Sequence, residues 1–235
     1  MSSMRSRRIL NELRNINKDL KDTNIFVSYD TSNISELKAM IIGPEDTIYS
    51  GGFYLFKIEI PDNYPTYPPI FTVMNQFKQP YIRFNPNLYT NDGGKVCIST
   101  LNTTSRSEEN SWNSTIKISN ILIQILAQLN NNPLTNIAEY SSKTMNDPDV
   151  INYNLLVWFY NLKFCTSYIL NNINKEYKGF NKFKSIITKH LKKSKQNYLK
   201  SIEEKRNYDK QKISSLYNMT DIIDLKSLRT IINNI

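Results

Sequence analysis

The chain is short of histidine, since only His190 among its 235 residues is of that type. Cysteine proteases activate their thiol with a neighbouring histidine, and most zinc centres take their ligands from histidine or from several cysteines. The shortage argues against a cysteine–histidine protease pair and against a histidine-based metal centre, unless His190 itself serves. A cysteine enzyme of this composition therefore needs a substrate that is already activated.

Cysteine is nearly as scarce, with only Cys97 and Cys165 in the chain. Two thiols are too few to predict a disulfide framework or a zinc site, so we predict no bound metal. The surroundings of the two thiols differ. Cys97 follows a glycine-rich turn in a polar loop, which favours a reactive thiol, whereas Cys165 lies on an apolar helical stripe, which favours a packed one.

Long apolar runs are lacking too. No window reaches about 18 uninterrupted apolar residues, the length that a membrane helix needs. The N-terminus, MSSMRSRRIL, is basic, but no apolar run follows it, so the pattern does not predict a signal peptide. We therefore expect a protein of the cytoplasm or nucleus, without membrane association.

The chain is rich in basic charge, with a net charge of +9. Such a charge is typical of proteins that bind acidic partners, nucleic acid or membranes, and equally of a solvated basic surface. Asn, Ile, Lys and Tyr are abundant and have AT-rich codons, so the composition also reflects the genome. The aromatic residues fall on apolar stripes rather than in a basic stacking platform, which argues against nucleic-acid binding.

The first third of the chain predicts one helix followed by an antiparallel meander. Apolar residues recur at steps of three or four across residues 4–20, as on one face of a helix. Four strand-like runs follow, joined by short turns. They are residues 25–29, 37–42, 48–60 and 70–74. Four prolines within residues 61–69 predict a rigid loop before the last strand.

The remainder of the chain predicts helices. Residues 118–129 carry one apolar stripe, and a second stripe runs through residues 151–169. Asp147-Pro148 is a typical N-cap and first-turn pair for that second helix. A basic segment over residues 174–214 and an amphipathic tail from Asp221 predict a helical extension.

Five segments occur in an order that is specific although each motif alone is weak. They are Gly43-Pro44-Glu45-Asp46-Thr47-Ile48-Tyr49-Ser50-Gly51-Gly52, Tyr64-Pro65 with Pro68-Pro69, Asn85-Pro86-Asn87, Gly94-Lys95-Val96-Cys97-Ile98-Ser99, and Trp112. Together they resemble the ubiquitin-conjugating enzymes over about residues 1–172. The runs Phe84-Asn85-Pro86-Asn87-Leu88-Tyr89 and Lys95-Val96-Cys97-Ile98-Ser99 are most similar to the larger members that write F-N-P-N. That subgroup includes the giant BIR-repeat conjugating enzyme and the enzyme charged by the alternative ubiquitin activating enzyme.

The resemblance assigns roles to the residues of the central loops. It implies that Cys97 carries ubiquitin as a thioester and that the side-chain amide of Asn87 stabilises the oxyanion. Asn87 could instead only pin the loop by hydrogen bonds, and the two roles are compatible. Asn85 and Pro86 are expected to support the loop around the active site.

The resemblance also implies two further sets of site residues. Asn136 and Glu139 occupy the region where a polar residue gates the acceptor lysine. The basic first helix, with Arg5, Arg7 and Arg8, is where the activating enzyme docks in the family, although an ordinary solvated helix explains these arginines equally well.

Two departures from the family concern the loops near Cys97. The step from Asn87 to Cys97 is ten residues, where the family commonly has eight. The additional residues must loop out within 90–94 if Asn87 is to reach the thioester. A polar insertion at residues 102–110 is interpreted as a lid or as a mobile loop.

We therefore expect an α+β protein with the ubiquitin-conjugating (UBC) fold. Residues 1–172 would form the catalytic core, and residues 173–235 a basic helical extension packed on it. The expected function is transfer of ubiquitin from Cys97 to a lysine of a target or to a ligase. The expected partners are ubiquitin, its activating enzyme, a ligase and protein substrates, with no stably bound cofactor, because ATP is used upstream. The alternative is an inactive module of the same fold that binds proteins of the ubiquitin pathway.

Overall fold

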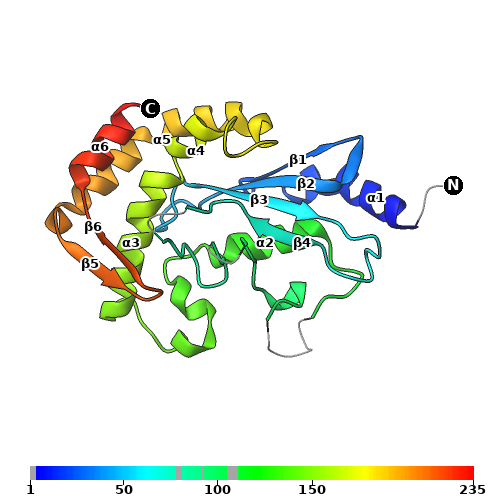
Figure 1. Cartoon of the computed structure of the whole chain (residues 1–235), viewed down its shortest axis with the longest axis horizontal. Coiled ribbons are helices and arrows are strands. Elements are labelled where there is room, and N and C mark those ends of the chain that lie inside the picture. The colour runs from blue at the N-terminus through cyan, green and yellow to red at the C-terminus, as the bar shows by residue number, and fades with distance from the viewer. Residues whose placement is uncertain (1–3, 78–80, 91–92, 105–110) are drawn as a thin grey trace.

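The computed structural model describes residues 4–77, 81–90, 93–104 and 111–235 (Figure 1). Its centre is a four-stranded sheet in the order β1-β2-β3-β4, with every neighbouring pair antiparallel. The strands are β1 (Ile25–Asp30), β2 (Asn33–Ile42), β3 (Phe53–Glu59) and β4 (Ile70–Val73). The predicted meander of four strands is confirmed.

The third strand starts later than its apolar run because residues 43–52 form a tight turn. The Gly43 amide donates to the Gly52 carbonyl at 2.8 Å. Gly51 has a φ of +69°, a conformation that favours glycine. The turn sets the register in which β3 pairs with β2.

Two helices flank the sheet as the apolar stripes predict. Helix α1 (Met4–Asp19) buries Ile9, Leu13 and Ile16, and helix α2 (Ile118–Gln128) lies under the sheet in Figure 1. Short 3-10 turns η1 (Ser99–Leu101), η3 (Pro133–Asn136) and η4 (Ala138–Tyr140) carry the connecting loops.

Helix α3 (Pro148–Phe164) starts where the Asp147-Pro148 pair predicts, but its capping differs. Asp147 occupies the N-cap position, yet its carboxylate accepts from the amide of Thr144, at 2.6 Å, instead of capping α3. The predicted pair of N-cap Asp147 and first-turn Pro148 is therefore confirmed, but the usual side-chain cap bond is missing because a local turn takes the same oxygen.

The second apolar stripe is divided between two helices rather than one. Helix α3 ends at Phe164, and α4 (Ser167–Asn172) follows after a break. The break arises because the carbonyl of Cys165 accepts from the amide of Phe53 in β3, at 2.7 Å, instead of serving a helical turn. The Cys165 thiol is fully buried beside the Asn75 amide, and burial raises the pKa of this thiol. The structural role predicted for Cys165 agrees with this position.

The extension is only partly helical. Helices α5 (Lys184–Glu204) and α6 (Leu225–Asn233) are present, with short turns η5 (Asn181–Phe183) and η6 (Arg206–Tyr208). The helix predicted up to Ser214 is wrong beyond Glu204, because the chain forms a hairpin of β5 (Lys212–Ser215) and β6 (Met219–Ile222). Tyr217 and Asn218 both have positive φ, as a mirror-image hairpin turn requires.

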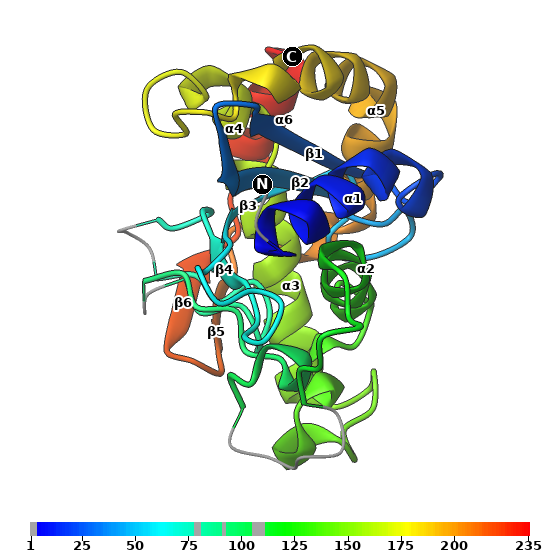
Figure 2. The same cartoon turned by 90° about the vertical axis from the view of Figure 1, so that its right-hand side faces the viewer.

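The extension covers the sheet face that α2 leaves open, as Figures 1 and 2 show together. The His190 ring packs edge-on against Phe53 with centroids 5.7 Å apart, and burial lowers the pKa of His190. The Tyr198 hydroxyl donates to the Gly51 carbonyl at 2.9 Å. The core therefore continues without interruption from the sheet into the extension.

Candidate active site

Two segments on either side of the lengthened loop pair as a short antiparallel ladder. The Cys97 amide donates to the Asn87 carbonyl at 2.8 Å, and the Tyr89 amide donates to the Lys95 carbonyl at 2.8 Å. Leu88 and Val96 form the bridge between these bonds. This pairing keeps Asn87 beside Cys97 despite the ten-residue step.

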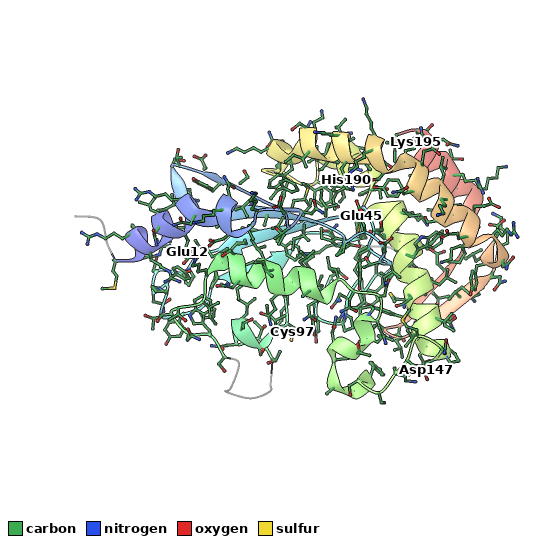
Figure 3. All side chains as sticks on the ribbon, turned by 180° about the vertical axis from the view of Figure 1, so that it is seen from behind. Glu12, Glu45, Cys97, Asp147, His190 and Lys195 are labelled. Atoms are coloured by element: carbon green, nitrogen blue, oxygen red, sulfur yellow. The ribbon has the colours of Figure 1, made fainter. Side chains whose placement is uncertain are left out.

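Cys97, labelled in Figure 3, lies below α2 in that view. It lines an open groove of about 770 Å³. Its thiol is partly exposed and donates to the Thr103 carbonyl at 3.1 Å. The residues lining this groove include four of the predicted site residues. They are Asn87, Cys97, Asn136 and Glu139. The fold thus brings together at one surface side chains that three separate loops supply.

The side chain of Asn87 is held in one orientation. Its Nδ2 donates to Oε1 of Gln128 at 2.8 Å, and its backbone amide donates to Oδ1 of Asn85 at 2.9 Å. A carboxamide has two N–H donors, so one remains for another acceptor. The arrangement suits a group that must donate to an oxyanion without first reorienting.

Asn85 is fully buried beneath this loop. Its Nδ2 donates to the Gln128 carbonyl at 2.9 Å and lies 3.4 Å from the Tyr49 hydroxyl. Tyr49 in turn donates to the Phe84 carbonyl at 2.7 Å. The buried network ties the loop to the sheet and to the end of α2.

Gln128 is one functional residue to which no motif in the sequence pointed. It is the last residue of α2, where helix carbonyls lack helical partners. Its carbonyl accepts from the side chains of Asn85 and Asn136, each at 2.9 Å, and its own amide oxygen holds Asn87. The end of α2 thereby fixes three of the site's asparagines. The only sequence signal for the position of Gln128 was the predicted end of the apolar stripe of this helix.

The two residues predicted to gate the acceptor lysine differ in how far their side chains are already hydrogen-bonded. Both polar atoms of Asn136 are engaged, with Nδ2 donating to Gln128 and Oδ1 accepting from Asn130. Glu139 lies in η4 and is exposed along the groove. Of these two, Glu139 therefore has the freer side chain for an incoming cation.

A known family matches most of the chain, including the loops that line this groove. The family model described as ubiquitin-conjugating enzyme matches residues 8–161. The chain belongs to the ubiquitin-conjugating enzyme family. Over 112 residues it is 40% identical to the human ubiquitin-conjugating enzyme E2 Z, covering 48% of this chain and 30% of that protein.

A second relative supports the predicted F-N-P-N subgroup of this family. Over 115 residues the chain is 37% identical to the human dual E2 ubiquitin-conjugating enzyme/E3 ubiquitin-protein ligase BIRC6, covering 48% of this chain and 2% of that protein. The matches thus span about a third of E2 Z and far less of BIRC6. The predicted family and subgroup are confirmed.

A solved structure shares the fold of this conjugating-enzyme core. It comes from Plasmodium yoelii and is described as a ubiquitin conjugating enzyme. The TM-score is 0.52 at 22% identity, over 71% of this chain and 98% of that one. The likeness confirms the predicted UBC fold.

In this family member the extension also reaches the catalytic loop, through a buried arginine. Arg83 is 7% exposed and donates to the carbonyls of Asn85 and Pro86, at 3.3 and 2.6 Å. Its guanidinium lies 3.5 Å from the ring centre of Tyr89 and 4.9 Å from that of Tyr217, in the β5–β6 turn. The hairpin thus holds Arg83 in place, and Arg83 holds the loop. Nothing in the local sequence predicted this contact.

Removing the hairpin's ring should loosen that loop. We expect Tyr217→Ala to slow the discharge of ubiquitin from Cys97 by about threefold to tenfold, because a desolvated cation–π contact is worth about 1–2 kcal/mol. Tyr217→Phe keeps the ring and serves as the matched control. Single-turnover discharge to free lysine measures the effect, and equal rates for the two variants would contradict the role of the ring.

The arginines of α1 are largely committed within the chain. Arg5 donates to the Pro61 carbonyl at 2.8 Å, and Arg8 pairs with the buried carboxylate of Glu12. Arg7 is exposed. Docking of an activating enzyme through all three stays a prediction, with Arg7 the most available of them.

Glu108 and Glu109, with the rest of residues 105–110, lie outside the described residues. Among the residues that the structure does describe, no three His, Cys, Asp or Glu side chains gather as metal ligands. Within the same ranges, no helix has the length and apolar character needed to cross a bilayer.

Proposed function

We propose that this chain accepts ubiquitin as a thioester on Cys97 and transfers it to a lysine of a target or to the thiol of a ligase. The observation that carries the proposal is the partly exposed Cys97 in a groove beside the anchored amide of Asn87. ATP would be used by the upstream activating enzyme, which supplies the activated carbonyl. A cytoplasmic or nuclear protein fits this role.

The first step would be an exchange of thioesters. The Cys97 thiolate attacks the carbonyl of ubiquitin's C-terminal glycine, and the thiolate of the activating enzyme leaves. In the second step a neutral lysine amine attacks the new thioester, an amide forms, and the Cys97 thiolate leaves while the amine's proton passes to solvent or a nearby carboxylate. Each step passes through a tetrahedral oxyanion.

The residues that line the groove would each have a separate role in the second step. The free N–H of Asn87 would donate to the oxyanion, and Gln128 would hold that amide in position. Glu139 would attract the acceptor lysine and receive its proton, because it is the exposed carboxylate on this groove. The absence of histidine from the groove's lining suits a reaction whose acyl group is already activated.

A charging assay tests the proposal. The protein is mixed with ubiquitin, ATP and each of a panel of activating enzymes, and we expect an adduct that reducing agent cleaves. Related modifiers in place of ubiquitin identify the one carried. A folded sample that forms no adduct with any activating enzyme would refute the proposal. Charging without discharge to free lysine would indicate a ligase-dependent enzyme.

A further inference from the structure

The net positive charge of the protein lies in its extension. Residues 1–172 contain 15 basic and 15 acidic side chains, whereas residues 173–235 contain 15 basic and six acidic. The whole net charge of +9 therefore belongs to the extension. The same codon bias acts on both parts, so genome composition alone does not explain the asymmetry.

Within the extension the charge concentrates on α5. No acidic residue occurs between Glu176 and Glu203, a stretch that holds eight lysines. In the described part of the chain, the ion pairs of this helix lie at its C-terminal end, where Lys200 faces Glu204 and Glu203 contacts Arg206. Among the residues that the structure describes, no Asp or Glu forms an ion pair with the lysines nearer the N-terminus of α5.

The lysine face is defined here as the exposed side chains of Lys182, Lys184, Lys189, Lys192 and Lys193. Lysines near a helix N-terminus oppose the helix dipole, and like charges three or four residues apart repel. The arrangement therefore disfavours the helix itself. A partner of opposite charge would remove both penalties.

A shallow depression marks this face. It has a volume of about 730 Å³ and is lined by Lys182, Lys184, Ser185, Thr188 and Lys189, with their neighbours Asn181 and Lys192. Its floor is rigid, because buried Ile187 and Leu191 fix the other side of α5 to the core. The depression thus offers lysine ammonium groups to anionic groups, whereas the Thr188 hydroxyl donates to the Lys184 carbonyl and one N–H of Lys182 donates to the Tyr29 carbonyl.

The chemistry of the face favours a polypeptide over a nucleic acid or a membrane. Bases stack on exposed aromatic rings, but Phe183 and Tyr198 of this segment are buried. Membrane-surface helices insert apolar side chains, but none of the large apolar residues exposed in the described part of the chain belongs to α5. Exposed lysines without exposed aromatic or apolar side chains beside them are suited to bind the flexible carboxylates of Asp and Glu side chains.

We propose that the lysine face is a docking surface for an acidic polypeptide segment, rich in Asp and Glu, of a substrate or partner protein. Lys195 on α5 and Cys97 lie on opposite sides of the molecule in Figure 3. A protein bound to this face leaves the groove open. The binding does not require the reaction at Cys97, so it stands or falls separately from the proposed function.

Direct binding tests the proposal. Helix α5 has 21 residues and is about 31 Å long, so an extended peptide of about ten residues, each rising about 3.3 Å, spans it. We expect a labelled peptide of alternating Asp, Glu and Gly to bind the full chain. The variant Lys189→Glu/Lys192→Glu/Lys193→Glu should weaken this binding at least about tenfold, since three surface ion pairs become repulsions. Raising salt from about 50 to about 300 mM should weaken it similarly.

Two controls separate a specific face from bulk charge. The variant Lys21→Glu/Lys212→Glu/Lys226→Glu changes the net charge equally at exposed positions off the face. It should retain binding to within about twofold, because charges beyond a Debye length are screened. The milder Lys189→Gln/Lys192→Gln/Lys193→Gln variant should lose part of the affinity while its thermal unfolding stays at or above that of the wild type.

Several results would overturn the proposal. Equal losses in the control and face variants would show that net charge alone attracts the peptide. Tighter lysine-dependent binding of a random oligonucleotide would assign the face to nucleic acid. Tighter binding of phosphatidylserine vesicles would assign it to a membrane. Retained peptide affinity in the face variant would show that the peptide binds elsewhere.

Discussion

Replacing Cys97 by serine is expected to abolish the reducible ubiquitin adduct. A serine hydroxyl is a far weaker nucleophile than a thiolate at neutral pH, and the ester that it forms resists reducing agent. The variant should give either no adduct or one that only strong base cleaves. Non-reducing and reducing gels of a charging reaction measure this directly.

Cys165 provides the matched control for that substitution. Its thiol is fully buried against Asn75, so it has no access to a thioester. Cys165→Ala should charge like the wild type while losing about 1–2 kcal/mol of unfolding free energy, because a small cavity opens and Asn75 loses a weak acceptor. A reducible adduct that survives in Cys97→Ser and disappears in Cys165→Ala would reverse the assignment.

Asn87→Ala is expected to slow discharge of the charged enzyme by about 10²–10³-fold, the usual effect of removing one oxyanion donor. Charging should be affected less, because the activating enzyme supplies groups of its own for that step. Single-turnover discharge to free lysine, followed over time, gives the rate. A loss below about threefold would reduce Asn87 to a loop support.

Gln128→Met tests whether Gln128 acts through Asn87. Methionine keeps the length of the side chain but lacks the amide oxygen, and we expect a discharge about fivefold slower, since one hydrogen bond is worth about 1 kcal/mol. In an Asn87→Ala background the same change should slow discharge by less than about twofold, because the effects of substitutions at two residues that act as one unit are not additive.

Gln124 supplies the comparison for this cycle. It lies one turn earlier on α2, lines the same groove and accepts from the Thr100 hydroxyl rather than from Asn87. Gln124→Met should combine additively with Asn87→Ala. Additive behaviour of Gln128→Met as well would show that Gln128 supports the site in another way.

The sequence by itself determined the family and most of the core, and it singled out Cys97 as the proposed nucleophile. The F-N-P-N and K-V-C-I-S runs are contiguous, so a short stretch of chain carries the information. The helical stripes and the alternating run in β3 are local periodicities, which depend only on backbone geometry. The difference between Cys97 and Cys165 could likewise be inferred from the few residues around each.

Only the tertiary structure decided how the catalytic loop is held. Gln128 and Asn87 are 41 residues apart in the sequence. The Arg83 amide donates to the sulfur of Met219 in the hairpin, 136 residues away. Contacts of this kind produce no periodic pattern in the sequence. They depend on how the end of a helix and the turn of a hairpin are positioned in space. The predicted helix up to Ser214 was wrong for a related reason. The composition of this basic segment is typical of a helix, but the turn at Tyr217 and Asn218, both with positive φ, makes it a hairpin. The sequence singled out the thiol, and the packing of a distant helix end oriented the side chain of Asn87.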